Sequence, residues 1–159
     1  MRGMSASDLG ISDIPMSILI AAVMTSITVP AVWSAYQNLS VNMTVDALEN
    51  EITDMLDMVR AVMDGGVGSV VEVDLDIKHW GSSEVERVEM GGSMNGSSER
   101  FMVSYTITGY GKGFLCLDPP VQMISSGNEG GLALTEGTYR LRLEHGSVED
   151  MELCFLELV

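Results

Sequence analysis

The stretch from Ile14 to Asp64, IPMSILIAAVMTSITVPAVWSAYQNLSVNMTVDALENEITDMLDMVRAVMD, decides the fold of this chain. Its first part carries no charge, because residues 14–45 contain no Asp, Glu, Lys or Arg. Its last part is amphipathic, with apolar residues at spacings of three and four, namely Val45, Leu48, Ile52, Met55, Val59 and Val62. We therefore expect one continuous helix over 14–64, embedded in a membrane or a helix bundle at its start and carrying a folded domain at its end.

The start of the apolar run has the residues of a helix N-terminus. Ser12 and Asp13 are candidate N-caps, and Pro15 falls in the first turn, where its missing N–H costs nothing. Residues 14–36 would span roughly 35 Å as a helix, enough to cross a bilayer core of about 30 Å. A buried helix of a soluble domain is the alternative, but a domain of this size could hardly wrap 23 uncharged residues.

The uncharged segment has the composition of an assembly or membrane helix. Trp33 and Tyr36 come near its far end, where amphipathic rings favour the membrane interface. Pro30 removes one helical hydrogen bond and usually bends the helix, and Ser26 could help to satisfy the freed backbone. Small residues such as Ala21 and Ala22 allow close helix approach. The residues expected to contact lipid or neighbouring helices are Ile18, Leu19, Ile20, Val23, Ile27, Pro30, Val32 and Trp33.

Residues 1–13, MRGMSASDLGISD, form a polar leader. No small-residue cleavage site of the signal-peptide kind follows the apolar run, so we expect the run to be retained. Arg2 is the only basic residue before Arg60, and the positive-inside rule then favours a cytoplasmic N-terminus and an external C-terminus.

A small β-domain is expected over 67–159. Gly65 and Gly66 end the helix, and Val70–Ile77 then alternates apolar and acidic residues as a half-buried strand. Further strands are expected over 84–90, 101–107, 114–117, 121–124, 138–144 and 148–158. They are separated by a loop over 91–98, a glycine-rich turn over 109–113 and a turn at His145–Gly146. The predicted class is α+β, with an antiparallel sandwich or barrel-like sheet after the helix.

The charge balance excludes one class of function. The net charge is −15 and the sequence pI is near 4.2, whereas nucleic-acid binding needs a basic face.

His79 and His145 have no ligand-spaced partner and are expected on the surface, the latter in a turn. Asp74 and Asp76 share a strand face and are expected to be solvated, and GYGKG at 109–113 lacks the spacing of a phosphate-binding loop. We therefore expect no enzyme, no metal and no cofactor.

Two cysteines and three sequons bear on the compartment. Cys116 and Cys154 lie in strand-like runs and form either one disulfide or two buried thiols. Asn38-Leu-Ser, Asn42-Met-Thr and Asn95-Gly-Ser are N-glycosylation sequons on the side of Trp33 predicted to be external. Asn95, in the expected loop, is the best acceptor of the three, because Asn38 and Asn42 lie close to the apolar segment.

This layout resembles the type IV pilin superfamily, particularly archaeal pilin-like and archaellin-like proteins. The stretch ENEITDMLDMVRAVMDGGVGSVVEVDLDI, residues 49–77, is similar in running from a helix through glycines into the first strand. The resemblance implies a leader cut after Arg2-Gly3, a mature start at Met4 and an acid at the fifth mature position, Asp8. Here the apolar run begins near Ile14 and not at the cut, which leaves an uncut, membrane-anchored relative as an alternative.

Two functions follow from these observations. One is a pilin-like subunit of a cell-surface filament, whose partners are its own copies, other pilin-like subunits and membrane lipid. The other is a single-pass anchored envelope adhesin or accessory component of a filament machine. The sequenced N-terminus separates them, because a start at Met4 favours the filament and a start at Met1 favours the anchor.

Overall fold

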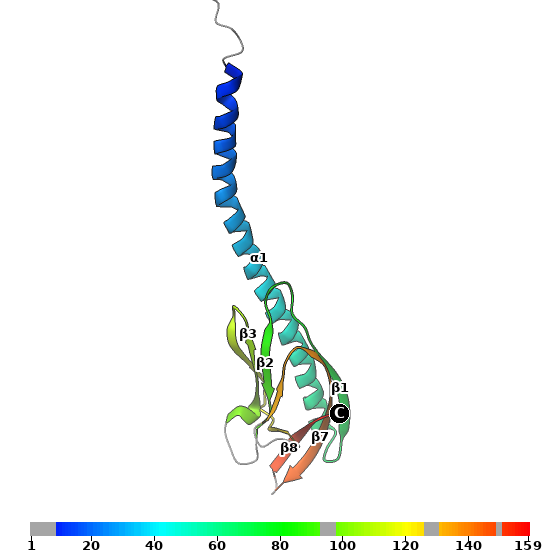
Figure 1. Ribbon diagram of the computed structural model, residues 1–159. Coiled ribbons are helices and arrows are strands. Elements are labelled where there is room, and N and C mark those ends of the chain that lie inside the picture. Colours follow the sequence, from blue (N-terminus) through cyan, green and yellow to red (C-terminus); the bar gives the residue numbers. More distant parts are fainter. Residues whose placement is uncertain (1–8, 93–97, 126–130, 149–150) are drawn as a thin grey trace, which may run out of the picture. The chain divides into compact units, whose positions relative to one another are not determined.

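The computed structural model describes residues 9–92, 98–125, 131–148 and 151–159. Within those ranges one long helix, α1, is followed by eight strands and a short 3₁₀ helix (Figure 1). Their bounds are α1 Leu9–Asp64, β1 Val70–Ile77, β2 Val85–Met90, η1 Ser98–Phe101, β3 Met102–Ile107, β4 Gly111–Cys116, β5 Met123–Ser125, β6 Leu132–Leu134, β7 Gly137–Val148 and β8 Met151–Leu158. The chain divides into two compact units, Met1–Leu39 and Ser40–Val159. The predicted α+β class is confirmed.

The helix starts earlier than its sequence predicts. α1 begins at Leu9, five residues before the expected start at Ile14, so Ser12 and Asp13 are helical and do not cap it. Pro15 lies in the seventh helical position and not in the first turn. Proline leaves the carbonyl one turn earlier without its usual donor, but its fixed φ suits a helix, so the backbone continues through it. Our expected start followed the apolar run, and helical backbone does not require one.

The second half of α1 supplies the core of the second unit. The predicted stripe is confirmed, since its six residues are at most 7% exposed: Val45, Leu48, Ile52, Met55, Val59 and Val62. All six belong to one hydrophobic cluster with strands of both sheets. The helix ends as predicted, with the Gly65 N–H donating to the Ala61 carbonyl oxygen at 3.1 Å and Gly66 at a φ of +85°.

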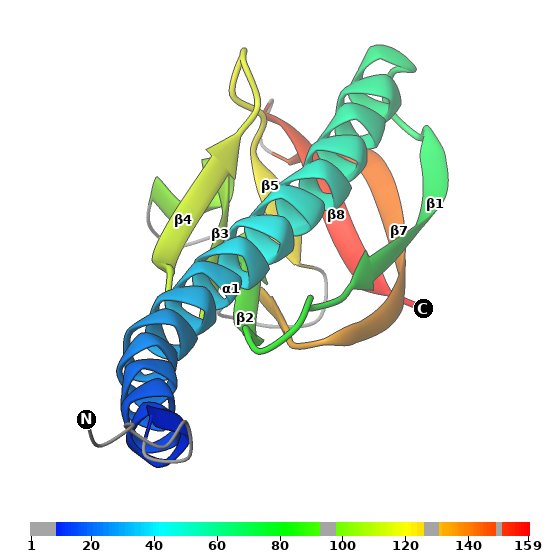
Figure 2. The ribbon, with the colours of Figure 1, turned by 90° about the horizontal axis from the view of Figure 1, so that it is seen from above.

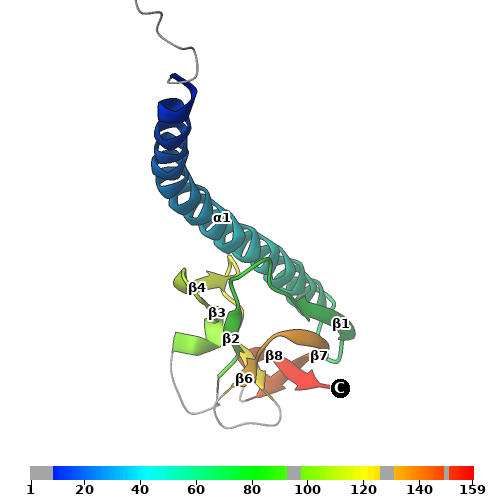
Figure 3. The same cartoon turned by 45° about the horizontal axis from the view of Figure 1, so that its top comes forward.

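The strands form two four-stranded sheets, in the orders β1-β7-β8-β5 and β4-β3-β2-β6. Neighbouring strands are antiparallel except β5 and β8, which are parallel. A bridge between Gly92 and Ile124 connects the two sheets. Figure 2 shows the second half of α1 crossing both sheets, and Figure 3 shows the same helix covering them from another side. The core therefore lies between the amphipathic helix and one face of each sheet.

Several strand predictions were wrong in detail. The expected buried strand at 114–117 is β4, which begins at Gly111 and exposes Phe114 by 66%, and so the turn before it is shorter than 109–113. The expected turn at His145–Gly146 lies inside β7. Strand β6 was not predicted, because three residues are too few to show an alternating pattern.

Candidate functional site

The most unusual surface of the first unit is the uncharged part of α1. Every residue from Met16 to Leu39 is exposed in the single chain. The apolar residues predicted to contact lipid or other helices are 51–68% exposed for Ile18, Leu19, Ile20, Val23, Ile27, Val32 and Trp33, and Pro30 is exposed as well. Together with the exposed side chains of Met24 and Leu39, these residues surround the helix and do not form a single stripe. We call residues 16–39 the apolar segment.

Three hydroxyl groups of the apolar segment bond to the backbone of their own helix. Thr25 Oγ1 donates to the Ala21 carbonyl oxygen at 2.8 Å, and Thr28 Oγ1 donates to that of Met24 at 2.9 Å. Ser26 Oγ donates to the Val23 carbonyl oxygen at 2.7 Å, so it does not replace the N–H that Pro30 lacks. With these three hydroxyls bonded to the backbone, the middle of the segment presents a mainly apolar surface.

Two aromatic rings lie near the end of the apolar segment. The ring centroids of Trp33 and Tyr36 are 5.9 Å apart, with a tilt of 35° between the rings. Together with Thr28, Val29 and Val32 they line a pocket with a volume of about 480 Å³. Rings of this kind concentrate at the membrane–water interface or in closely packed helix contacts.

By length and composition α1 is able to cross a membrane. In the part of the chain that the structure describes, it is the one helix with this property, and its most apolar window has no buried residue. An N-terminal signal sequence would meet the same criterion. The apolar segment is thus suited to a membrane anchor or a signal sequence.

The two sequons on the helix have hydroxyl groups with a structural role. Asn38 and Asn42 are exposed, but Ser40 and Thr44 are only 5% and 0% exposed. Ser40 Oγ donates to the Trp80 carbonyl oxygen and accepts from the Ser82 N–H at 3.0 Å. Thr44 Oγ1 accepts from the Trp80 N–H at 2.9 Å. These hydroxyls fasten the loop after β1 to the helix, which accounts for their presence without a glycan.

Another hydrogen bond within the second unit joins the helix directly to a sheet. Tyr105, on β3, is 2% exposed, and its hydroxyl donates to the Glu49 carboxylate on α1. Burial, reinforced by that carboxylate, raises the pKa of Tyr105 above its usual value. The sequence did not indicate this pair, because Glu49 lies among acidic residues that face solvent.

The cysteines and histidines do not form a joint site. Cys116 is exposed on β4 and Cys154 is buried on β8, in different sheets, and both are free thiols, so the bridge considered from the sequence is absent. Burial raises the pKa of the Cys154 thiol to about 12.

His79 is exposed as predicted, with Nδ1 2.8 Å from a carboxylate oxygen of Glu136. His145 was expected in a surface turn, but it is 2% exposed.

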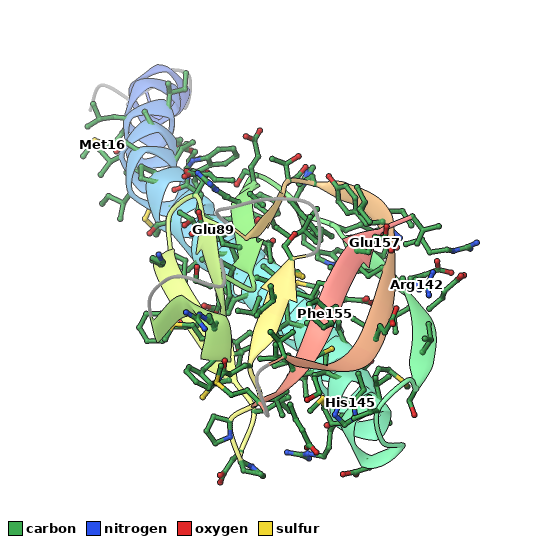
Figure 4. The ribbon with its side chains drawn as sticks, turned by 90° about the horizontal axis from the view of Figure 1, so that it is seen from below. Met16, Glu89, Arg142, His145, Phe155 and Glu157 are labelled. Atoms are coloured by element: carbon green, nitrogen blue, oxygen red, sulfur yellow. The ribbon has the colours of Figure 1, made fainter. Side chains whose placement is uncertain are left out.

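The burial of His145 follows from its place in β7. It alternates with Leu141 and Leu143 on the face that packs against α1, beside the last turns of that helix (Figure 4). Arg142 lies on the outward face with Phe155 and Glu157 of β8. The pattern of the strand therefore continues through a residue that reads as polar in the sequence.

The acidic pair on β1 has basic partners. The guanidinium group of Arg140 bonds to Asp74 at 2.8 Å and holds the pKa of that carboxyl below its usual value. A hydrogen bond from Lys78 lowers the pKa of Asp76 in the same way. Each carboxylate therefore has its own cation on the strand surface, a pairing that the expectation of a solvated acidic face did not include.

The four predicted processing residues, Arg2, Gly3, Met4 and Asp8, lie outside the described residues, and so does the sequon asparagine Asn95.

Comparison of the chain with protein-family models, with curated proteins and with solved structures finds no match.

Proposed function

We propose that this chain is a structural, pilin-like subunit of an extracellular filament related to type IV pili, assembled through its apolar segment. One observation carries the proposal: 24 consecutive helical residues, 16–39, are exposed in the single chain and contain no charge. Such a surface is compatible with lipid or with copies of itself, and not with water.

The energetic reason for self-assembly is the burial of large apolar side chains. Residues such as Ile18, Ile27 and Val32 are 64–68% exposed. Burying a side chain of this size contributes about 1.5–3 kcal/mol, so a bundle that covers several per subunit gains substantially. In lipid this term is absent, and close packing at Ala21 and Ala22 is what favours helix contacts there. The same segment can thus hold the subunit in a membrane before assembly and line the filament core afterwards.

The two halves of α1 have separate roles in this proposal. The stripe from Val45 to Val62 is covered by the sheets of its own chain, so it is unavailable to other copies. The apolar segment has no such cover within its own unit. Assembly therefore depends on residues 16–39 and leaves the β-domain free to form the outer surface.

A single-pass membrane anchor that carries a binding module is the second candidate. The Trp33–Tyr36 ring pair near the end of the apolar segment favours it, because such rings mark a membrane interface. In that case the chain is an envelope adhesin or an accessory component, and it does not polymerise.

The experiment that tests the proposal is Ile20→Asp in the full-length chain. A carboxylate at this position, now 55% exposed and apolar, would have to be buried without a partner in the bundle. We expect negative-stain electron micrographs to show fibres for the unchanged chain and none for the variant. Val67→Asp is the matched control, because Val67 is 64% exposed on the loop after α1 and should leave fibres intact.

Fibres that persist in Ile20→Asp would contradict assembly through the apolar segment. Sequencing the N-terminus of the native protein separates the two candidates. A start at Met4 supports the processed filament subunit, and a start at Met1 supports the anchor.

A further inference from the structure

Strand β4 is a free edge of its sheet. Among the described residues it pairs with β3 on one side, from Gly111 opposite Ile107 to Cys116 opposite Met102, and with no strand on the other. Figure 2 shows β4 as the outermost strand of this sheet. An edge of this kind offers unpaired backbone N–H and C=O groups to another strand.

The side chains along this edge include exposed aromatic rings and no carboxylate. Phe114 is 66% exposed and Tyr110, just before the strand, is 51% exposed. Residues 101–117 contain no Asp or Glu, in a chain with a net charge of −15. The one charged group, Lys112, lies 3.8 Å from Glu89 of the same sheet, so its charge is balanced within the chain.

The other strand edges have features that disfavour pairing with a strand of another chain. β1 carries the charged residues Glu72, Asp74 and Asp76, and charged side chains on an edge strand disfavour pairing with another strand even where, as for Asp74 and Asp76, they have a basic partner within the chain. β5 and β6 have three residues each, too few for a stable new pair, and β5 is also joined to the other sheet through Ile124. Of the described edges, β4 alone combines length, exposed aromatic surface and the absence of carboxylates.

We infer that the free edge of β4 is a docking surface for β4 of a second copy of this chain, paired antiparallel. A second copy fits because it brings the same acid-free stretch, whereas most of the surface of either chain would bring opposed carboxylates. A two-fold axis perpendicular to the joined sheets places the two Phe114 rings on the same face, next to each other.

This contact is distinct from the one proposed for the apolar segment. It lies wholly in the second unit and can form between anchored monomers or between subunits of neighbouring filaments. Attachment to one membrane or one fibre raises the local concentration of the β-domains, and a weak edge contact becomes populated under those conditions.

Cysteine cross-linking of the full chain in a nonionic detergent tests the inference. Lys112 and Cys116 share one face of β4, and about 13 Å separates them along the strand, too far for a disulfide within one chain. In an antiparallel pair whose two-fold axis passes at Phe114, position 112 of one copy lies beside Cys116 of the other. Lys112→Cys should therefore give disulfide-linked dimers under mild oxidation, in excess of the unchanged chain.

Controls at Val67 separate a specific contact from collisions in the micelle. Val67→Cys supplies an equally exposed thiol off the edge and should cross-link no more than the unchanged chain. Adding Phe114→Glu to Lys112→Cys should lower the dimer yield about fivefold or more, because it opposes two carboxylates across the pair. Adding Val67→Glu should not. Near-ultraviolet circular dichroism checks that both variants keep the native packing.

Two results would overturn the inference. One is a dimer yield for Lys112→Cys no higher than for Val67→Cys, which would leave β4 unpaired or paired with a different protein. The other is an equal yield with Phe114→Glu and with Val67→Glu, which would show that the thiols meet without strand pairing.

Discussion

At the scale of single residues, Ser40 and Thr44 show how a sequence motif can have a structural cause. They are spaced four apart, so they lie on one side of α1, and both hydroxyls bond to the backbone of residues 80–82. The sequons that contain them therefore need no glycan to explain their hydroxyl groups.

Thr44→Val should lower the free energy of unfolding by about 1–2 kcal/mol, because the Trp80 N–H loses its acceptor. Denaturant unfolding of non-glycosylated protein measures the change. Asn42→Gln removes the same sequon and should leave stability within about 0.5 kcal/mol. Thr53→Val is the second control, since its hydroxyl is exposed and bonds only to the Glu49 carbonyl oxygen one turn earlier. Equal stability of Thr44→Val and Thr53→Val would refute the role of the loop contact.

The two thiols should differ in reactivity. Cys116 is exposed, whereas burial keeps Cys154 protonated with a pKa of about 12. Alkylation at pH 8 should modify one thiol per native chain, at Cys116, and two in denaturant, as counted by mass spectrometry. Because the folded-state pKa is raised, this group also makes stability fall as the pH rises from about 8.5 towards 12. Rapid native labelling of Cys154 would contradict its buried position.

Residue-level predictions from the sequence failed where a side chain was judged by type alone. His145 reads as a turn residue because Gly146 follows it, yet a Cβ at Gly146 would lie 2.3 Å from the ring of Phe155. Gly113, which reads as part of a turn, is covered in the same way by the ring of Tyr105. These glycines make room for an aromatic ring on a neighbouring strand, and no pattern within one segment shows which strand that is.

At the scale of elements, periodicity was the reliable signal. The 3.6-residue stripe of α1 and the two-residue alternation of β1 were both predicted from the sequence, because each element buries one face against a single core. The start of α1 at Leu9, the length of β7 and the parallel pairing of β5 were not predictable. The two strand features depend on hydrogen bonds between segments distant in sequence, and the helix start does not follow the apolar run from which it was predicted.

The packing of the helix against the sheets is tested by Ile52→Ala. Ile52 is fully buried, and its truncation should lower the free energy of unfolding by about 2–4 kcal/mol through lost contacts and a cavity. Met58→Ala is the matched control on the same helix, where the side chain is 44% exposed and the loss should stay below about 1 kcal/mol. Denaturant unfolding measures both changes. A similar loss of unfolding free energy in the two variants would contradict the packing of Ile52 in the core.

At the scale of the whole molecule, charge and apolar surface act in opposite directions. A net charge of −15 per chain makes copies repel, while burial of the apolar segment favours their association in the proposed filament. The apolar segment could be predicted from the sequence, because an uncharged run of this length is uncommon outside membrane helices and helix bundles. The free edge of β4 could not, because the sequence does not show which strands end a sheet.

Because charge repulsion opposes association of the apolar surfaces, we predict that self-association strengthens as the salt concentration rises. The screening length falls from about 30 Å at 0.01 M to about 3 Å at 1 M ionic strength, so repulsion between the acidic domains weakens. Sedimentation velocity in nonionic detergent should show larger assemblies at 1 M than at 0.01 M sodium chloride. Association that is independent of salt, or weaker at high salt, would mean that the acidic surfaces do not approach one another.

Electron cryomicroscopy of fibres from cells that make this protein would show directly whether the apolar segments assemble. We expect a filament whose core is a bundle of helices, with Ile20, Ile27 and Val32 of each subunit buried against other copies and the β-domains outside. Native protein that occurs only as a membrane-embedded monomer, or a filament built without contacts between these helices, would contradict it.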